Sequence, residues 1–446
     1  MNKTESILKP FANVQGGAYL PHNKNTKDLE TKVIAAPKFV KIPMVQHIGA
    51  PCEVKVAVGD KVYIGTKIGD SNAFVSAPIH SSISGTVTAI NKERIANGSL
   101  CEVVVIENDF ENKTDPNIKP VDINTAQDLV NAARECGLVG LGGAGFPTYI
   151  KLKADENKPI DTLIINGAEC EPYITADYRE CIENPDDILF GIYFIKNILN
   201  IKNVIIAIED NKPKAIDLLY KIAADKQDIN DEVKLMKLKS RYPQGAEKVL
   251  VYTACKRKIP LGKLPADVGC IVLNITSIGV LARYIKTGMP LTHKRITVDG
   301  NAIEKTGNYL CPIGMSIADI LDNLGMKDAE KILLGGPMMG NAISDLSVPL
   351  VKQNNAILCF KGKESLAFEP TNCINCARCM NACPMNLAPR GIEVAIEFKA
   401  TAEELKQKGA EYCIECGSCA FSCPARRSLV QAMRLAKAEI RKAGNK

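Results

Sequence analysis

Two stretches near the C-terminus, CINCARCMNACP over residues 373–384 and CIECGSCAFSCP over residues 413–424, share one pattern and decide how the last part of the chain folds. Each reads C-x2-C-x2-C-x3-C-P, in which three closely spaced thiolates hold one iron–sulfur cluster and the fourth cysteine reaches the other cluster. The pattern therefore predicts two [4Fe-4S] clusters with crossed ligands. One cluster would be held by Cys373, Cys376, Cys379 and Cys423, and the other by Cys413, Cys416, Cys419 and Cys383.

Zinc is the alternative occupant, because C-x2-C pairs also form tetrahedral zinc sites. A zinc site typically takes two separated pairs and has no use for a third cysteine at this spacing, so we favour iron–sulfur clusters. The chain has 17 cysteines, and those outside the two runs show no ligand spacing. We expect them to be small buried hydrophobic residues.

Length and composition indicate a globular protein of several domains. At 446 residues the chain is expected to form about three domains. The net charge of +6 is not gathered into basic stripes with aromatics between them, so nucleic acid is not an expected partner. No apolar stretch approaches the ~18 residues of a spanning helix, and the N-terminus lacks the apolar core of a signal peptide. We therefore expect no transmembrane span, and a reducing compartment in which cysteines bind metal.

Residues 38–106 alternate as short strands and turns, and the pattern is similar to that of lipoyl and biotinyl β-sandwich domains. The modified lysine of those domains is absent here, because residues 79–82 (Ile-His-Ser-Ser) occupy the tip turn. We expect the fold without a swinging arm. His80 is expected to be a surface residue.

After a polar linker, the pattern changes to alternating helices and strands. A helix is predicted over 125–136 behind a Thr cap, and short apolar strands over 161–165 and 203–208, which together favour a parallel sheet. Strands at 295–298 and 331–334 with a helix between them indicate a β-grasp unit, and 392–408 is predicted to be helical. The expected domains are 1–110 (β-sandwich with an N-terminal extension), 120–290 (α/β), 291–350 (β-grasp) and 355–446 (helical, with the cysteine runs).

The segment GLGGAG over residues 140–145 matches G-x-G-x-x-G by letter. The dinucleotide fingerprint must follow a strand and open a helix, whereas here a predicted helix precedes it and Phe146-Pro147 follows. An ordinary Rossmann site is therefore not favoured. The glycines still allow a close approach of backbone N–H groups to an anion, and Lys151 follows shortly after.

Four longer segments carry a more specific signal: GLVGLGGAGFPTYIK (137–151), IINGAECEP (164–172), YPQGAEK (242–248) and LNITS (273–277). Together they resemble the FMN- and NADH-binding subunit of respiratory complex I. Their order and the cluster-bearing C-terminus are more similar still to the C subunits of the Rnf complex, the ion-translocating ferredoxin:NAD oxidoreductase. The resemblance covers most of the chain. It implies a multidomain fold with a lipoyl-like β-sandwich, a complex I FMN-binding-like α/β domain, an SLBB-like β-grasp unit and a helical dicluster ferredoxin domain.

The same resemblance implies a set of site residues. Noncovalent FMN would contact Gly140, Gly142, Lys151, Asn166 and Glu169, with Tyr242, Gly245, Asn274 and Ile275 closing the pocket. Phe146 would stack on NADH, and Glu171 and Glu247 would bind its hydroxyls. Ala168 and Ala246 replace acidic residues of the complex I subunit, which implies fewer hydrogen bonds to FMN. Taken singly, Glu169 and Glu171 are equally typical of helix caps, and Lys151 of a solvated lysine.

The implied function is that of a peripheral enzyme subunit on the cytoplasmic side of the cell membrane. It would pass electrons between NAD(H), FMN, two [4Fe-4S] clusters and partner subunits of the Rnf complex, especially an iron–sulfur subunit. A flavin suits this role because NADH delivers two electrons together and a cluster accepts one. Two alternatives stay open: a flavin-free iron–sulfur scaffold, and a soluble NADH dehydrogenase or diaphorase subunit.

The chain ends in the basic segment ARRSLVQAMRLAKAEIRKAGNK, with apolar residues in a broken helical stripe. One interpretation is a helix that packs on the cluster-bearing domain. The other is a basic end that docks on acidic subunits or anionic headgroups. The second predicts that truncation after Leu429 weakens attachment and leaves both clusters in place.

Overall fold

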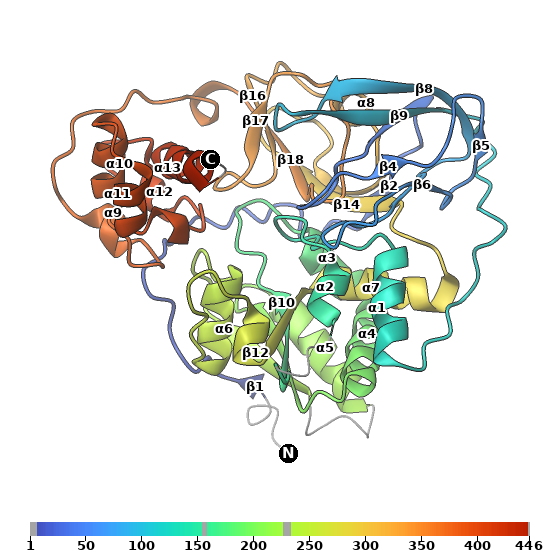
Figure 1. Cartoon of the computed structure of the whole chain (residues 1–446), viewed down its shortest axis with the longest axis horizontal. Coiled ribbons are helices and arrows are strands. Elements are labelled where there is room, and N and C mark those ends of the chain that lie inside the picture. The colour runs from blue at the N-terminus through green and yellow to red at the C-terminus, as the bar shows by residue number, and fades with distance from the viewer. Residues whose placement is uncertain (1–6, 154–157, 226–232, 445–446) are drawn as a thin grey trace.

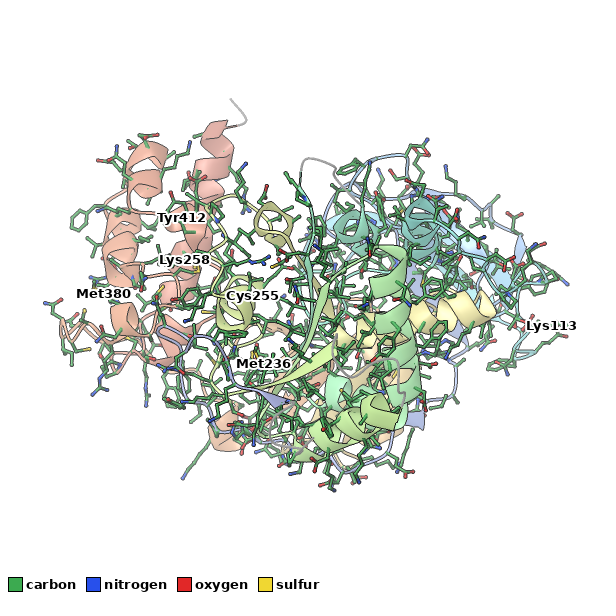
Figure 2. All side chains as sticks on the ribbon, turned by 90° about the horizontal axis from the view of Figure 1, so that it is seen from below. Lys113, Met236, Cys255, Lys258, Met380 and Tyr412 are labelled. Atoms are coloured by element: carbon green, nitrogen blue, oxygen red, sulfur yellow. The ribbon has the colours of Figure 1, made fainter. Side chains whose placement is uncertain are left out.

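The computed structural model describes residues 7–153, 158–225 and 233–444. Figure 1 shows the helices that carry the cysteine runs as a separate group at one end of the molecule, with the α/β unit below and the two β units above. Figure 2 shows Met380, from the cysteine-bearing helices, at the opposite end of the molecule from Lys113. No helix of the described residues is long and apolar enough to cross a membrane.

The predicted parallel sheet is confirmed. Its order is β1-β12-β11-β10-β13, and every neighbouring pair of strands runs parallel. The strands are apolar because helices cover both faces of the sheet. Its strands are β1 (Ile7–Leu8), β10 (Thr162–Gly167), β11 (Asn203–Glu209), β12 (Val233–Leu238) and β13 (Cys270–Asn274). Its helices are α1 (Ala126–Glu135), α2 (Thr148–Leu152), α3 (Ala176–Glu183), α4 (Pro185–Ile198), α5 (Pro213–Asp225), α6 (Glu247–Cys255) and α7 (Ile275–Thr287).

The helix predicted over 125–136 begins as its sequence indicates. The Thr125 side chain accepts a hydrogen bond from the backbone N–H of Asp128, and the Asp128 carboxylate accepts one from the backbone N–H of Thr125. This capping box satisfies two N–H groups that a helix start leaves without partners.

The β-sandwich pattern near the N-terminus is also confirmed. One sheet has the order β3-β9-β8-β5 and the other β4-β6-β7. The expectation of a surface His80 is wrong, because its side chain is only 5% exposed. Burial beside Lys352 holds the pKa of His80 well below its ordinary value, so the imidazole is neutral. The strands are β3 (Phe39–Pro43), β4 (Glu53–Val54), β5 (Lys61–Val62), β6 (Lys67–Asp70), β7 (Ile79–His80), β8 (Gly85–Arg94) and β9 (Leu100–Asn108).

The third unit has the expected β-grasp elements, and its sheet draws in two strands from outside the expected limits of 291–350. The sheet order is β17-β16-β18-β14-β15-β2. β18 follows residue 350 and β2 comes from the N-terminal extension, so this sheet joins three stretches of the chain. Its elements are β2 (Lys32–Val33), β14 (His293–Asp299), β15 (Gly307–Pro312), α8 (Ile317–Leu324), β16 (Lys331–Leu334), β17 (Asn341–Ile343) and β18 (Ala356–Phe360).

The C-terminal unit is helical, but the single helix predicted over 392–408 is wrong. The chain forms two helices there, because Lys399 adopts a left-handed φ of 54° and Thr401 starts a new helix with a capping box to Glu404. The helices of this unit are α9 (Arg378–Asn381), α10 (Pro389–Glu397), α11 (Ala402–Gln407), α12 (Ser418–Phe421) and α13 (Leu429–Gly444).

The basic C-terminal segment packs on its own unit, as the first of the two interpretations predicts. Met433, Ala436 and Ile440 on α13 are buried against α10 and α11. Arg434 and Lys437 form ion pairs with Glu415, which follows Cys413 in the second cysteine run. Much of the positive charge of this segment is therefore neutralised within the unit.

Candidate functional site

The residues expected to contact FMN gather at the carboxyl edge of the parallel sheet. Asn166 and Asn274 lie near the ends of the adjacent strands β10 and β13 and face each other in the register of the pair. In open α/β sheets, ligands bind in the crevice outside the carboxyl ends of the strands. The fold thus places the implied flavin site where such sheets form one.

The glycine-rich loop lies over this edge. Gly142 and Gly143 are exposed, and their backbone N–H groups have no acceptor among the described residues. A Cβ atom on Gly142 would lie 2.6 Å from the amide nitrogen of Asn274, so only glycine allows this close approach. Free N–H groups held against the sheet edge fit an anionic cofactor.

The amide side chains of Asn166 and Asn274 organise the loops around the edge. Asn166 Nδ2 donates to the carbonyl oxygen of Gly245 at 2.9 Å. Asn274 Oδ1 accepts from the backbone N–H of Ser277 at 3.1 Å and so caps α7, while its Nδ2 donates to Asp177 at 2.7 Å. These contacts join β10, β13, the 242–248 segment and α3 into one edge.

The carboxylates of Glu169 and Glu171 accept hydrogen bonds from different parts of the chain. The Glu169 carboxylate accepts from the backbone N–H groups of Asp177 and Tyr178 at the start of α3, which is the helix-cap role. The Glu171 carboxylate accepts from the backbone N–H groups of Met338 and Met339, in the loop after β16. Burial raises the pKa of each carboxyl to about 7.

Lys151 is not an unpaired surface lysine. Its Nζ lies 2.6 Å from Glu247 Oε1 and also donates to the carbonyl oxygen of Val272 at 3.2 Å. Both side chains are partly exposed, at 27% and 34%. The resemblance assigns Lys151 to FMN and Glu247 to NADH, and the structure places these two side chains next to each other.

Three other expected residues have different surroundings. Ile275 is 0% exposed and lies in the core of the α/β unit, so its side chain is not on a pocket wall. Tyr242 is 3% exposed, and its hydroxyl donates to the carbonyl oxygen of Cys416 in the second cysteine run. Phe146 is half-buried beside Gly140, whose N–H donates to the Phe146 carbonyl oxygen.

Four lysines that sequence reasoning missed hold the backbone of these loops; Lys24 is half-buried and the other three are buried. Lys24 Nζ donates to the carbonyl oxygens of Glu169, Glu171 and Ile174. Burial lowers the pKa of Lys24 to about 8. No local pattern marks Lys24, because its partners lie about 150 positions away in the chain. The other three lysines donate to carbonyl oxygens as follows: Lys212 to Ala168, Lys294 to Leu141 and Lys352 to Gly137.

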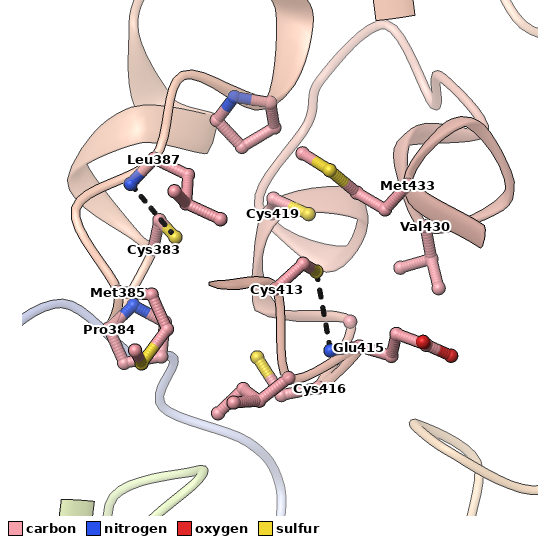
Figure 3. Close-up of a pocket in the computed structure, with 13 residues that line it drawn as sticks. Cys383, Pro384, Met385, Leu387, Cys413, Glu415, Cys416, Cys419, Val430 and Met433 are labelled. Atoms are coloured by element: carbon pink, nitrogen blue, oxygen red, sulfur yellow. Dashed lines mark hydrogen bonds between the residues drawn. The ribbon is translucent and has the colours of Figure 1, made fainter. Parts of the chain in front are cut away.

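The two cysteine runs form two pockets, and each pocket takes three cysteines from one run and one from the other. Crossed ligation requires this grouping. The first pocket is lined by Cys373, Cys376, Cys379 and Cys423. The second is lined by Cys383, Cys413, Cys416 and Cys419, with Cys383 on one side and the other three opposite (Figure 3).

Backbone N–H groups point at the sulfur atoms in both pockets. Asn375 N donates to Cys373 Sγ at 3.4 Å in the first pocket, and Glu415 N donates to Cys413 Sγ at 3.3 Å in the second. Both donor residues have a left-handed φ of 55°. Such hydrogen bonds stabilise thiolate ligands, so the donor set fits a pair of [4Fe-4S] clusters.

The pockets differ in size and burial. The cavity volume is about 300 Å³ for the first pocket and about 20 Å³ for the second. Cys376 in the first pocket is exposed, whereas Cys416 in the second is 7% exposed. Burial raises the pKa of Cys413 to about 11, so loading this pocket releases a proton from that thiol.

Met433 on α13 lines the second pocket. The expectation that truncation after Leu429 spares both clusters is therefore not supported, because it removes a wall of this pocket.

Three stretches of the chain match known protein families. Residues 12–111 match the RnfC barrel sandwich hybrid domain, residues 133–283 the Nuo51 FMN-binding domain, and residues 365–424 a 4Fe-4S dicluster domain.

Two curated proteins are similar over nearly the whole chain. One is the C subunit of the proton-translocating ferredoxin:NAD(+) oxidoreductase complex of Clostridium ljungdahlii, 38% identical over 99% of this chain and 96% of that protein. The other is the C subunit of the Na(+)-translocating ferredoxin:NAD(+) oxidoreductase complex of Acetobacterium woodii, 36% identical over 97% of this chain and 98% of that protein. Among solved structures, an NAD+-reducing [NiFe]-hydrogenase matches with a TM-score of 0.48 and 17% identity, over 72% of this chain and 67% of the hydrogenase chain.

Proposed function

The chain belongs to the family of Rnf complex C subunits, and on this premise we propose that it passes electrons between NAD(H), FMN, two [4Fe-4S] clusters and partner subunits. It is an electron-transfer subunit of a ferredoxin:NAD oxidoreductase complex. The observation that carries the proposal is the presence, in one chain, of an FMN-binding domain with an open sheet edge and two pockets of four thiols.

The residues at the sheet edge have separate tasks in this proposal. The free N–H groups of the glycine loop and the ammonium of Lys151 receive the anionic part of FMN, and the amide of Asn166 fixes the loop beside it. Glu171 and Glu247 accept hydrogen bonds from the hydroxyls of NADH. The flavin supplies the conversion between two-electron and one-electron transfer.

The eight motif cysteines would hold the clusters in the crossed arrangement, with four thiols around each pocket. The partners are other subunits of the Rnf complex, and an iron–sulfur subunit among them is the natural electron partner. We place the subunit at the cytoplasmic face of the membrane complex. Copurification with the other subunits from solubilised membranes, identified by mass spectrometry, tests the partners, and protease accessibility of the subunit in sealed vesicles of known orientation tests the face.

Glu247→Ala tests the nucleotide site. The variant should keep its flavin absorbance and need a higher NADH concentration for half-maximal reduction of an artificial acceptor, because it loses a hydroxyl acceptor. Glu53→Ala, which removes an exposed carboxylate from the β-sandwich, is the matched control. Loss of flavin with unchanged NADH dependence would contradict the role of Glu247.

Gly142→Val tests the flavin site. Its first side-chain carbon would press on the Asn274 amide, so the purified variant should lack the yellow flavin absorbance and retain its iron. Wild-type protein that binds iron but no flavin would instead support the alternative of an iron–sulfur scaffold.

A further inference from the structure

One side chain connects the sheet edge to the second pocket. Tyr242 begins the 242–248 segment, in which the carbonyl oxygen of Gly245 accepts the hydrogen bond from Asn166. The Tyr242 hydroxyl donates to the carbonyl oxygen of Cys416 at 2.6 Å, within the second cysteine run. A buried hydrogen bond of this length restrains both partners. The implied flavin site and the second pocket therefore share a fixed contact.

The N-terminal segment passes through the same contact. Gly17 N donates to the carbonyl oxygen of Ala382 at 2.9 Å, and Ala18 exchanges two backbone hydrogen bonds with Tyr242, at 2.7 and 3.0 Å. Ala382 precedes Cys383, the crossed ligand of the second pocket. Figure 1 shows this segment, in blue, running between the cysteine-bearing helices and the rest of the molecule.

The N-terminal segment requires glycine at positions 16 and 17, where it lies between Tyr242 and the second pocket. Gly16 and Gly17 have left-handed φ values of 64° and 77°. A Cβ atom on Gly16 would lie 2.8 Å from the backbone carbonyl of Cys383, and one on Gly17 would collide with the carbonyl oxygen of Tyr242. The segment thus fits between Tyr242 and the second pocket because it has no side chains there.

The β-grasp unit also touches the second run. A Cβ on Gly417 would lie 3.0 Å from the carbonyl oxygen of Met338, so the two backbones are close. Met338 N in turn donates to Glu171 at the sheet edge. The second pocket is therefore enclosed by the α/β unit, the N-terminal segment and the β-grasp unit.

The first pocket has no such enclosure. Within the described part of the chain, the hydrogen bonds of residues 373–381 stay inside the C-terminal unit. Ile374 is 68% exposed and Met380 is 50% exposed at its rim. Figure 2 shows Met380 on the outer side of the molecule.

We infer that the second pocket is the inner electron carrier, which exchanges electrons with the flavin-bearing edge, and that the first pocket is the outer carrier. Tyr242 is the positioning residue that fixes this order. The inference rests on the proposed function and adds the sequence of transfer to it. In the NADH-oxidising direction, one NADH would give NAD⁺, one proton and two electrons; FMN would accept the pair, and each cluster would accept one electron at a time. Tyr242 would hold the second run at a fixed place beside the flavin-bearing edge.

Single-pocket variants of the full-length holoprotein test the order. Cys376→Ser removes a ligand from the first pocket and Cys419→Ser one from the second, and EPR of samples frozen after NADH addition reports which cluster is reduced. We expect NADH to reduce the remaining cluster of Cys376→Ser as in wild type. The remaining cluster of Cys419→Ser should respond to dithionite and lose its response to NADH. The reverse pattern would overturn the inference.

Tyr242→Phe tests the positioning role with both clusters in place. Loss of the hydroxyl should slow NADH-driven reduction of both clusters about fivefold, which corresponds to about 1 kcal/mol, and leave reduction by dithionite unchanged. Tyr412→Phe is the matched control and should react as wild type, because Tyr412 directly precedes Cys413 in the sequence and is not among the residues that line the pocket. Equal rates for the two variants would refute the role of Tyr242.

Flavin bleaching separates this inference from the proposed function. If NADH does not bleach the flavin of the wild-type holoprotein, the proposed function fails and the inference fails with it. If bleaching is normal and both single-pocket variants respond equally to NADH, only the inference fails.

Discussion

Residues 373–384 and 413–424 have the same cysteine spacing, but the structure surrounds them differently. The first run is at the outer end of the molecule, with Ile374 68% exposed. The second is enclosed, with Cys416 7% exposed and its carbonyl oxygen bound to Tyr242. Local spacing therefore decides which thiols can share a pocket, while contacts with distant parts of the chain decide how accessible that pocket is.

The largest expected effect is loss of a cluster, and it tests whether the two runs depend on each other. Cys423→Ser should destroy the cluster of the first run, and Cys383→Ser that of the second, because each residue lines the pocket of the other run. EPR spectra and iron content of the two variants measure this. Cys101→Ser, a buried cysteine on β9, is the control. If each variant loses the cluster of its own run, crossed ligation is wrong.

Substitution of one methionine in each pocket tests how tightly the two pockets are packed. Met433 is 1% exposed in the second pocket and Met380 is 50% exposed at the first. Met433→Ala should lower the free energy of unfolding by about 3 kcal/mol, whereas Met380→Ala should change it by less than about 0.5 kcal/mol. Denaturant unfolding of the holoproteins gives both values. Equal losses would show that the first pocket is also enclosed, for instance by a second chain.

Glu171 accepts hydrogen bonds from Met338 and Met339, and Met338 lies against the second cysteine run. The contribution of Glu171 to the stability of the protein should depend on pH. The folded protein holds the pKa of this carboxyl at about 7 from an ordinary 4.5, so between these values it binds more protons than the unfolded chain. Its contribution to stability therefore falls as pH rises from about 4.5 to 7 and levels off above that, by an amount on the order of 2 kcal/mol.

Glu171→Gln should remove this dependence, so the difference in melting temperature between variant and wild type should shift in favour of the variant from pH 5 to pH 8. Glu53→Gln, at an exposed carboxylate, controls for the change of charge. A constant difference across this range would show that Glu171 is not the titrating group.

The smallest expected effects come from two glycines, one at each pocket. Gly16→Ala should destabilise the protein by about 1–2 kcal/mol, because alanine is strained at a φ of 64° and would press on Cys383. Gly391→Ala, within α10 at the first pocket, meets only Ala388 at 3.6 Å and should stabilise by about 0.5 kcal/mol. Thermal unfolding compares them. Similar effects at both sites would remove the contrast between an enclosed and an open pocket.

The sequence predicted the elements whose signals are local. The Thr125 cap, the apolar strands β10 and β11 and the β-grasp helix all appear where the pattern placed them, because capping and side-chain periodicity act over a few residues. It failed at 392–408, where helix-forming residues on both sides concealed the break at Lys399.

The candidate site was predicted in part. The resemblance named Asn166, Asn274 and the glycine loop, and the structure brings these together at one sheet edge. It gave no sign that Ile275 is in the core or that Lys24 holds the 169–174 loop. These outcomes depend on residues that are far apart in the sequence.

By itself, the sequence determined the two groups of four thiols, since the reach of each cysteine follows from its spacing along the chain. It also determined the parallel sheet and the family. Only the tertiary structure decided that the second pocket is inner and the first is outer. Tyr242, Gly16 and Gly17 lie far from residues 413–424 in the chain, and no local pattern reports a contact that forms when separate units pack together.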